Sequence, residues 1–181
     1  EGYFGRLQYN FDERIFGSAS LRRDASSRFH PDYRWGTFWS VGGAWLINKE
    51  SWFYAPWVQE LKIKASVGSQ GNDNIGDFRY TDVFDIINSD NKVGTAFYSK
   101  GTKDITWETN TNFNIGAEFQ LWNRVTGSIE YYRRKTSDML FSFSVAPSLG
   151  YSSYFDNVGN MVNSGVEMDF NVNIFNTRNF T

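Results

Sequence analysis

The chain has 181 residues, of which 19% are aromatic, 16 are Gly, 3 are Pro and none is Cys. The lack of Cys excludes a disulfide scaffold and a thiolate metal site, and a formal net charge of −2 without any basic run argues against a nucleic-acid partner. The sequence contains no run of about 18 apolar residues, which excludes a transmembrane helix.

Apolar and polar residues alternate with a period of two through much of the first third of the chain. This is the period of a β-strand with one apolar and one polar face, and the aromatic and β-branched content also favours strands. The apolar faces of the first four predicted strands are Tyr3, Gly5, Leu7, Tyr9 and Phe11; Ile15, Gly17, Ala19 and Leu21; Trp39, Val41, Gly43, Trp45 and Ile47; and Leu61, Ile63, Ala65 and Val67.

The alternation is cleaner in the second half. Three further apolar faces are Phe113, Ile115, Ala117, Phe119 and Leu121; Val125, Gly127, Ile129 and Tyr131; and Val166, Met168, Phe170, Val172 and Ile174. The sixth strand is expected to run on through Met139, Phe141 and Phe143. The chain thus predicts about seven strands and the start of another, each of roughly 9–11 residues, which is the length that a tilted strand needs to cross a bilayer.

Short and long connections alternate between these strands. The connections at 12–13, 123–124 and 176–179 are short, that at 48–57 is intermediate, and those at 24–35, 69–111 and 144–163 are long. Tight periplasmic turns and large extracellular loops are typical of outer-membrane barrels. A mean hydropathy of −0.50 is compatible with this class because lumen and loop residues are polar. The sequence predicts an all-β fold, a segment of an antiparallel transmembrane β-barrel.

The ends of the chain indicate a fragment of a longer protein. Glu1 leads directly into a strand pattern without a signal region, and residues 176–181 resemble a turn that enters another strand. Unpaired strand edges in lipid cost several kcal/mol per backbone group, so we expect the missing strands in the parent protein.

No arrangement of residues predicts an enzyme or a cofactor. His30 is the only histidine and sits in the first long loop next to Pro31, and no G-x-S-x-G nucleophile motif is present, so we expect His30 to be a solvated loop residue. The loop at 69–111 is rich in Asp but lacks the Gly and Glu spacing of an EF-hand, which favours a solvated loop over a calcium site and predicts no metal.

Aromatic residues outside the strand faces have two interpretations. The seven Trp residues fall mostly near predicted strand ends, where membrane proteins carry an aromatic girdle. The aromatics of the longest loop, Phe78, Tyr80 and Tyr98, are candidates for stacking on a glycan, and the sequence does not choose between that role and a structural one.

Several blocks, in order over nearly the whole chain, resemble the SusC/RagA family of TonB-linked outer-membrane proteins. They lie at 2–11, 18–29, 35–45, 61–68, 71–76, 107–109, 114–116, 131–138, 150–154, 157–159 and 163–167. One block is Arg22-Arg23-Asp24-Ala25-Ser26-Ser27-Arg28-Phe29. The family usually has R-x-D-G-S-S-R-F here, so Ala25 departs at the glycine.

The resemblance implies a nutrient transporter of the outer membrane of a Gram-negative, Bacteroidetes-like cell. The parent would be a barrel of about 22 strands, too wide for side chains to fill, with a plug domain that this chain lacks. The plug would contact TonB, a SusD-like surface lipoprotein would cap the mouth, and oligosaccharides or peptides would be the substrates. Substrate would be held by extracellular loops and by lumen-facing polar residues such as Asn112, Asn114, Glu118 and Gln120.

Two other functions are weighed against the transporter. One is a small closed barrel that acts as a membrane anchor or adhesin. The other is a secreted β-sandwich that binds glycan, which would dissolve without detergent. The regular placement of long loops at one end favours the transporter over the sandwich.

Overall fold

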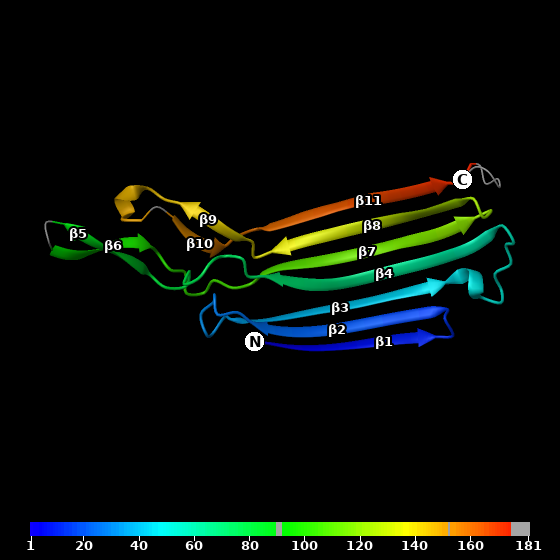
Figure 1. Ribbon diagram of the computed structural model, residues 1–181, viewed down its shortest axis with the longest axis horizontal. Helices are drawn as coiled ribbons and strands as arrows, with labels where there is room; N and C mark the ends of the chain where they lie inside the picture. Colours follow the sequence, from blue (N-terminus) through cyan, green and yellow to red (C-terminus); the bar gives the residue numbers. More distant parts are fainter. Residues whose placement is uncertain (90–91, 152, 175–181) are drawn as a thin grey trace, which may run out of the picture.

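The computed structural model describes residues 1–89, 92–151 and 153–174. Seven long strands form one antiparallel sheet in the order β1-β2-β3-β4-β7-β8-β11 (Figure 1). Their bounds are β1 Gly2–Phe11, β2 Ile15–Ala25, β3 Trp35–Leu46, β4 Val58–Asn72, β7 Glu108–Leu121, β8 Val125–Ser137 and β11 Asn160–Val172. The predicted all-β barrel fold and its antiparallel pairing are confirmed.

The pairing register keeps the predicted apolar residues on one face of the sheet. Val41 pairs with Val67, Ala65 pairs with Ile115, and Ile115 also pairs with Tyr131. A slip of one residue would move every side chain of a strand to the other face, so the match holds only in this register. These residues form the apolar face, and the alternate positions form the polar face.

At one end of the sheet the β4–β7 and β8–β11 connections are long, whereas the other end carries the short β1–β2 and β7–β8 turns and the intermediate β3–β4 connection (Figure 1). The long-loop end carries two hairpins, β5 Val83–Ser89 with β6 Lys92–Ser99, and β9 Leu140–Ser144 with β10 Ser153–Asn157. Both hairpins lie beyond the ends of the long strands. The 3-10 helices are η1, Ile47–Lys49, in the β3–β4 connection and η2, Pro147–Leu149, in the β9–β10 connection. The predicted asymmetry of the connections is confirmed.

Two details differ from the sequence-based expectation. The strands have 10 to 15 residues, because polar pairs such as Asn72 with Glu108 extend β4 and β7 into the predicted loop. The extension of the sixth strand through Met139 is wrong, since β8 ends at Ser137 and Asp138 turns the chain with a φ of 54°. Residues Phe141 and Phe143 belong to β9 and pair with β10. The predicted turn at 176–179 and the strand after it lie outside the described residues.

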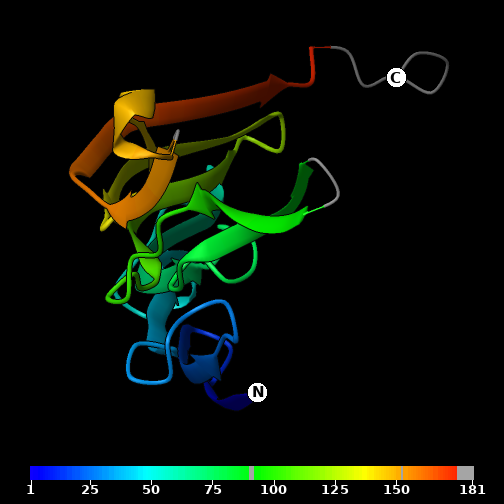
Figure 2. The same ribbon diagram turned by 90° about the vertical axis from the view of Figure 1, so that its left-hand side faces the viewer.

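The sheet does not close on itself. Strands β1 and β11 each have a neighbour on one side only. Seen from the long-loop end, they lie at opposite ends of the sheet (Figure 2). Among the described residues, no helix is long and apolar enough to span a membrane.

Candidate functional site: the polar face and the loop base

A ladder of ion pairs crosses the polar face between β4, β7 and β8. Lys62 Nζ donates to Glu118 Oε2 at 2.9 Å, and Lys64 Nζ lies 2.9 Å from both Glu118 Oε1 and Glu130 Oε2. The four side chains are about one-third exposed. Alternation on each strand places the residues on one face, and the register brings them together. Glu118 is therefore held by two cations rather than free to bind a ligand.

The other polar residues predicted on β7 share this face but differ in their surroundings. Asn112 Oδ1 accepts a hydrogen bond from Arg134 Nε at 2.9 Å. Asn114 lies between Ser66 and Tyr132 in the register, and Gln120 lies between Glu60 and Thr126. Asn112 and Asn114 line a hollow of about 760 Å³, whereas Gln120 lines a separate, smaller one of about 370 Å³.

Residues that sequence reasoning missed complete the larger hollow. The sequence does not single out Arg134, because residues 132–137 of this strand are polar on both faces and show no alternation. The polar residues that line the hollow from β4, β8 and β11 are Ser66, Ser69, Gln70, Glu130, Tyr132, Arg133, Arg134, Asn163, Ser164 and Glu167. Glu130 and Glu167 alternate with apolar neighbours in the sequence, but the proximity of the lining residues depends on the register. This wall of amides, hydroxyls and charges is suited to a polar ligand.

The aromatic residues of the longest loop have different environments. Tyr80 packs against the buried cluster of Phe29, Ile75 and Ile105, which favours a structural role. Phe78 is 64% exposed and adopts a φ of 60°, and Tyr98 on β6 is 56% exposed. The structure therefore leaves Phe78 and Tyr98 accessible to a ligand and does not bring them together with the polar residues of β7.

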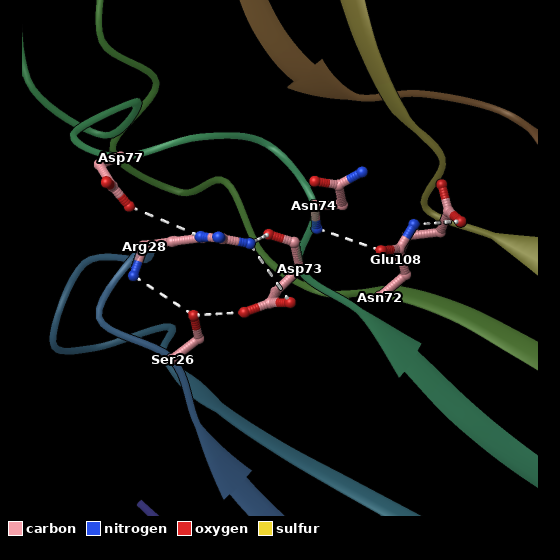
Figure 3. Close-up of polar contacts among 7 residues, drawn as sticks. All are labelled: Ser26, Arg28, Asn72, Asp73, Asn74, Asp77 and Glu108. Carbon is pink, nitrogen blue, oxygen red and sulfur yellow. Dashed lines mark hydrogen bonds and ion pairs between the residues drawn. The ribbon is translucent and has the colours of Figure 1, made fainter.

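A polar network fixes the base of the long loops (Figure 3). Ser26 Oγ donates to Asp73 Oδ2 at 2.7 Å, and Arg28 Nη1 donates to the Asp73 carbonyl at 3.0 Å. The Arg28 guanidinium also lies 3.5 Å from an Asp77 carboxylate oxygen. Beside it, Asn72 Nδ2 donates to Glu108 Oε1 at 3.1 Å. The block that resembles the family motif thus joins the β2–β3 loop to the β4–β5 loop.

A small hydrophobic cluster continues this connection. Phe29 and Ile105 are fully buried and Ile75 is 4% exposed, although they come from three different connections. Leu140 of β9 and Phe155 of β10 pack against the same cluster. His30 lies in contact range of Tyr80, with ring centroids 5.9 Å apart, and its side chain is only 25% exposed. His30 is therefore more enclosed than the solvated loop position that we expected.

Most Trp residues lie near the ends of the sheet, as predicted. At the short-turn end Trp57 stacks on Trp122 with ring centroids 5.3 Å apart, and Trp45 Nε1 donates to Glu50 Oε1. Trp107 differs, because it packs against Phe29 and its Nε1 donates to the Arg34 carbonyl. An amphipathic ring at a strand end suits a membrane interface, whereas Trp107 belongs to the loop base.

No metal site is formed by the part of the chain that the structure describes. Within residues 1–89, 92–151 and 153–174, no group of three or more His, Asp or Glu side chains is placed to hold a metal ion. Asp73 and Asp77 instead pair with Arg28. Asp90 of the predicted Asp-rich loop lies outside the described residues.

The chain is similar to outer-membrane receptors over its whole length. The family described as "TonB dependent receptor-like, beta-barrel" matches residues 1–181. The TonB-dependent receptor SusC of Bacteroides thetaiotaomicron is 34% identical, with 99% of this chain and 19% of SusC covered. The TonB-dependent receptor P26 of Formosa agariphila is 30% identical, with 98% of this chain and 19% of that protein covered.

The fold is similar to that of a solved transporter. A structure of the RagAB peptide importer in the "closed-closed" state matches 98% of this chain and 20% of its own chain, with a TM-score of 0.91 at 31% identity. The chain thus spans about a fifth of the length of the relatives that it matches. These relatives are receptors and a transporter rather than enzymes. From the family match and the strand register, the chain belongs to the TonB-dependent receptors, as a segment of their outer-membrane β-barrel.

Proposed function

We propose that the full-length protein containing this chain imports a nutrient, an oligosaccharide or a peptide, across the outer membrane. The chain would supply part of the barrel wall and extracellular loops, and a plug domain elsewhere in the protein would couple transport to TonB. The observation that supports this function best is the two-faced sheet, with long loops at one end and a hollowed polar face, in a chain that belongs to the TonB-dependent receptors.

A SusD-like surface lipoprotein is the partner that we propose at the extracellular mouth. Its support comes from the similarity to SusC and to the RagAB importer. The two hairpins at the loop end extend beyond the sheet, and the Ser26–Asp73 and Arg28–Asp73 contacts hold the base of the loops in place. The loop end would therefore offer such a partner an ordered surface. The other functions that we weighed, a membrane anchor and a secreted sandwich, have no comparable support.

Uptake by cells tests the import function. Cells that lack the gene for the full-length protein, and cells that lack TonB, are supplied with labelled oligosaccharide and peptide mixtures. We expect both cells to lose uptake of the same class of nutrient, and the complemented deletion to regain it. Unchanged uptake in the deletion, or uptake through the complemented protein without TonB, would contradict the proposal.

A further inference from the structure

The hollow on the polar face contains a cation and an anion that do not pair with each other. Arg134 lies at the end of β8 nearer the long loops, and Glu167 lies on β11 opposite Glu130. Neither Arg134 nor Glu167 takes part in an ion pair within the described residues. Both residues are exposed, so their charged groups are available to a ligand of opposite charge.

The guanidinium of Arg134 is anchored by a hydrogen bond to Asn112. Its Nε donates to Asn112 Oδ1 at 2.9 Å, which fixes one edge of the planar group. The remaining N–H groups are suited to bind a carboxylate through two parallel hydrogen bonds. Asn163, directly opposite Arg134 in the register, adds an amide beside it.

The opposite end of the hollow carries an excess of negative charge. Glu130 and Glu167 face each other on neighbouring strands, an arrangement that is unfavourable for like charges. Lys64 compensates Glu130 and is shared with Glu118. Glu167 is left to attract a further cation, and an ammonium group would fit because it can donate to both carboxylates.

The distance between Arg134 and the two glutamates limits the length of a ligand that can contact both ends of the hollow. Arg134 and Glu130 are four residues apart on β8, which corresponds to about 13 Å along the strand. An extended peptide of about four residues spans a similar length. Between the two ends, Ser66, Asn114 and Tyr132 supply hydroxyl and amide groups that can hydrogen-bond to peptide N–H and C=O groups.

We propose that this hollow binds short peptides with free termini, with Arg134 taking the carboxylate and the Glu130–Glu167 pair taking the amino group. This inference rests on the import function and selects peptides over neutral oligosaccharides. A neutral sugar would satisfy the amides but would leave both charges of the site unpaired.

The test uses the purified full-length receptor and a library of randomised tetrapeptides in three forms: with free termini, with an amidated C-terminus, and with an acetylated N-terminus. Retained peptides are quantified by mass spectrometry. We expect amidation to reduce retention by about tenfold in the wild type, as for loss of a charge-assisted hydrogen bond, and to have no effect in Arg134→Gln. Acetylation should reduce retention in the wild type and not in Glu167→Gln.

Matched variants separate binding from folding. Lys135→Gln removes a neighbouring positive charge from the opposite face of β8, outside the hollow, and should keep the wild-type preference for free carboxylates. Arg134→Lys keeps the charge but not the planar donor pair and should give an intermediate preference. Each variant is first shown to be folded by its heat-modified mobility in a detergent gel.

Two further outcomes would overturn the inference. Equal retention of free and amidated peptides by the wild type would exclude recognition of the terminus by Arg134. TonB-dependent uptake of cellotetraose without retention of peptides would overturn the peptide assignment and leave import standing. Absence of TonB-dependent uptake of either ligand would overturn the import function itself.

Discussion

Replacing Ile115 by Arg is expected to destabilise the barrel strongly. Ile115 lies near the middle of β7, on the apolar face between Ala65 and Tyr131. Because the apolar face of a transmembrane β-barrel is directed outward, we expect this face to contact lipid and Ile115 to lie near the bilayer midplane. An Arg on the lipid face at that depth costs roughly 2–4 kcal/mol. This cost shifts the folding equilibrium by about 30-fold to 1000-fold.

The neighbouring residue provides the matched control. Asn114→Arg introduces the same side chain one position away, but on the polar face, where Asn114 borders the hollow with Ser66 and Glu130. We expect a cost below about 1 kcal/mol there, because the guanidinium stays in a wet, acidic surrounding. The free energy of unfolding of both full-length variants is measured by denaturant titration in lipid vesicles. Equal losses at the two positions would refute the assigned facing of the sheet.

Three further predictions concern the ladder, the loop base and the sheet. Lys64→Ala should lower the free energy of unfolding by up to about 1 kcal/mol, mainly at low salt, because Glu130 loses its ion pair. Denaturation midpoints measured at several salt concentrations check this prediction, and a loss of stability that does not depend on salt would contradict it. Phe29→Ala should destabilise the loop base by about 3–5 kcal/mol, because it opens a cavity in the buried cluster. Hydrogen exchange should then show lost protection at Ile75 and Ile105. Unchanged protection at these two residues would argue against one packed loop base. Gly127→Val should destabilise the sheet by roughly 1–3 kcal/mol, because the Cβ of the new residue would lie 2.7 Å from the Asp169 carbonyl oxygen and 2.9 Å from the Phe119 ring. A free energy of unfolding equal to that of the wild type would contradict this prediction and show that β11 can shift.

The sequence was sufficient to predict the sheet because one physical rule governs every long strand. Alternating positions face lipid and water, so apolar residues such as Ile63, Ile115 and Ile129 mark the strands and their faces. The same rule fails at strand ends, where both faces are wet. The pair of Asn72 with Glu108 therefore falls within the predicted loop at 69–111 although it belongs to the sheet.

The structure of the loops could not be predicted from the alternation of apolar and polar residues. Phe141 and Phe143 alternate like a membrane strand, but they belong to a hairpin after the turn at Asp138. Nothing in the local pattern distinguishes that hairpin from a continued β8. The buried cluster of Phe29, Ile75 and Ile105 joins residues far apart in the chain, so it is visible only once the loops are placed.

The candidate site was predicted in part. Alternation on β7 placed Asn112, Asn114, Glu118 and Gln120 on one face correctly. The register then determined which of them are free, because it brings Lys62 and Lys64 to Glu118, and Arg134 to Asn112. The register between two strands cannot be predicted from the alternation of residues within either strand alone.

The central claim, that these strands cross the outer membrane with their long loops outside, is tested most directly by cysteine labelling. The chain contains no Cys, so single cysteines can be placed at Ile86, on the projecting β5–β6 hairpin, and at Glu13, in the β1–β2 turn. The full-length protein, with any other cysteines replaced, is treated on intact cells with a polymer-linked maleimide that is too large to cross the membrane. We predict labelling of Ile86→Cys on intact cells and of Glu13→Cys only after the outer membrane is opened. Equal labelling of both positions on intact cells would contradict the account.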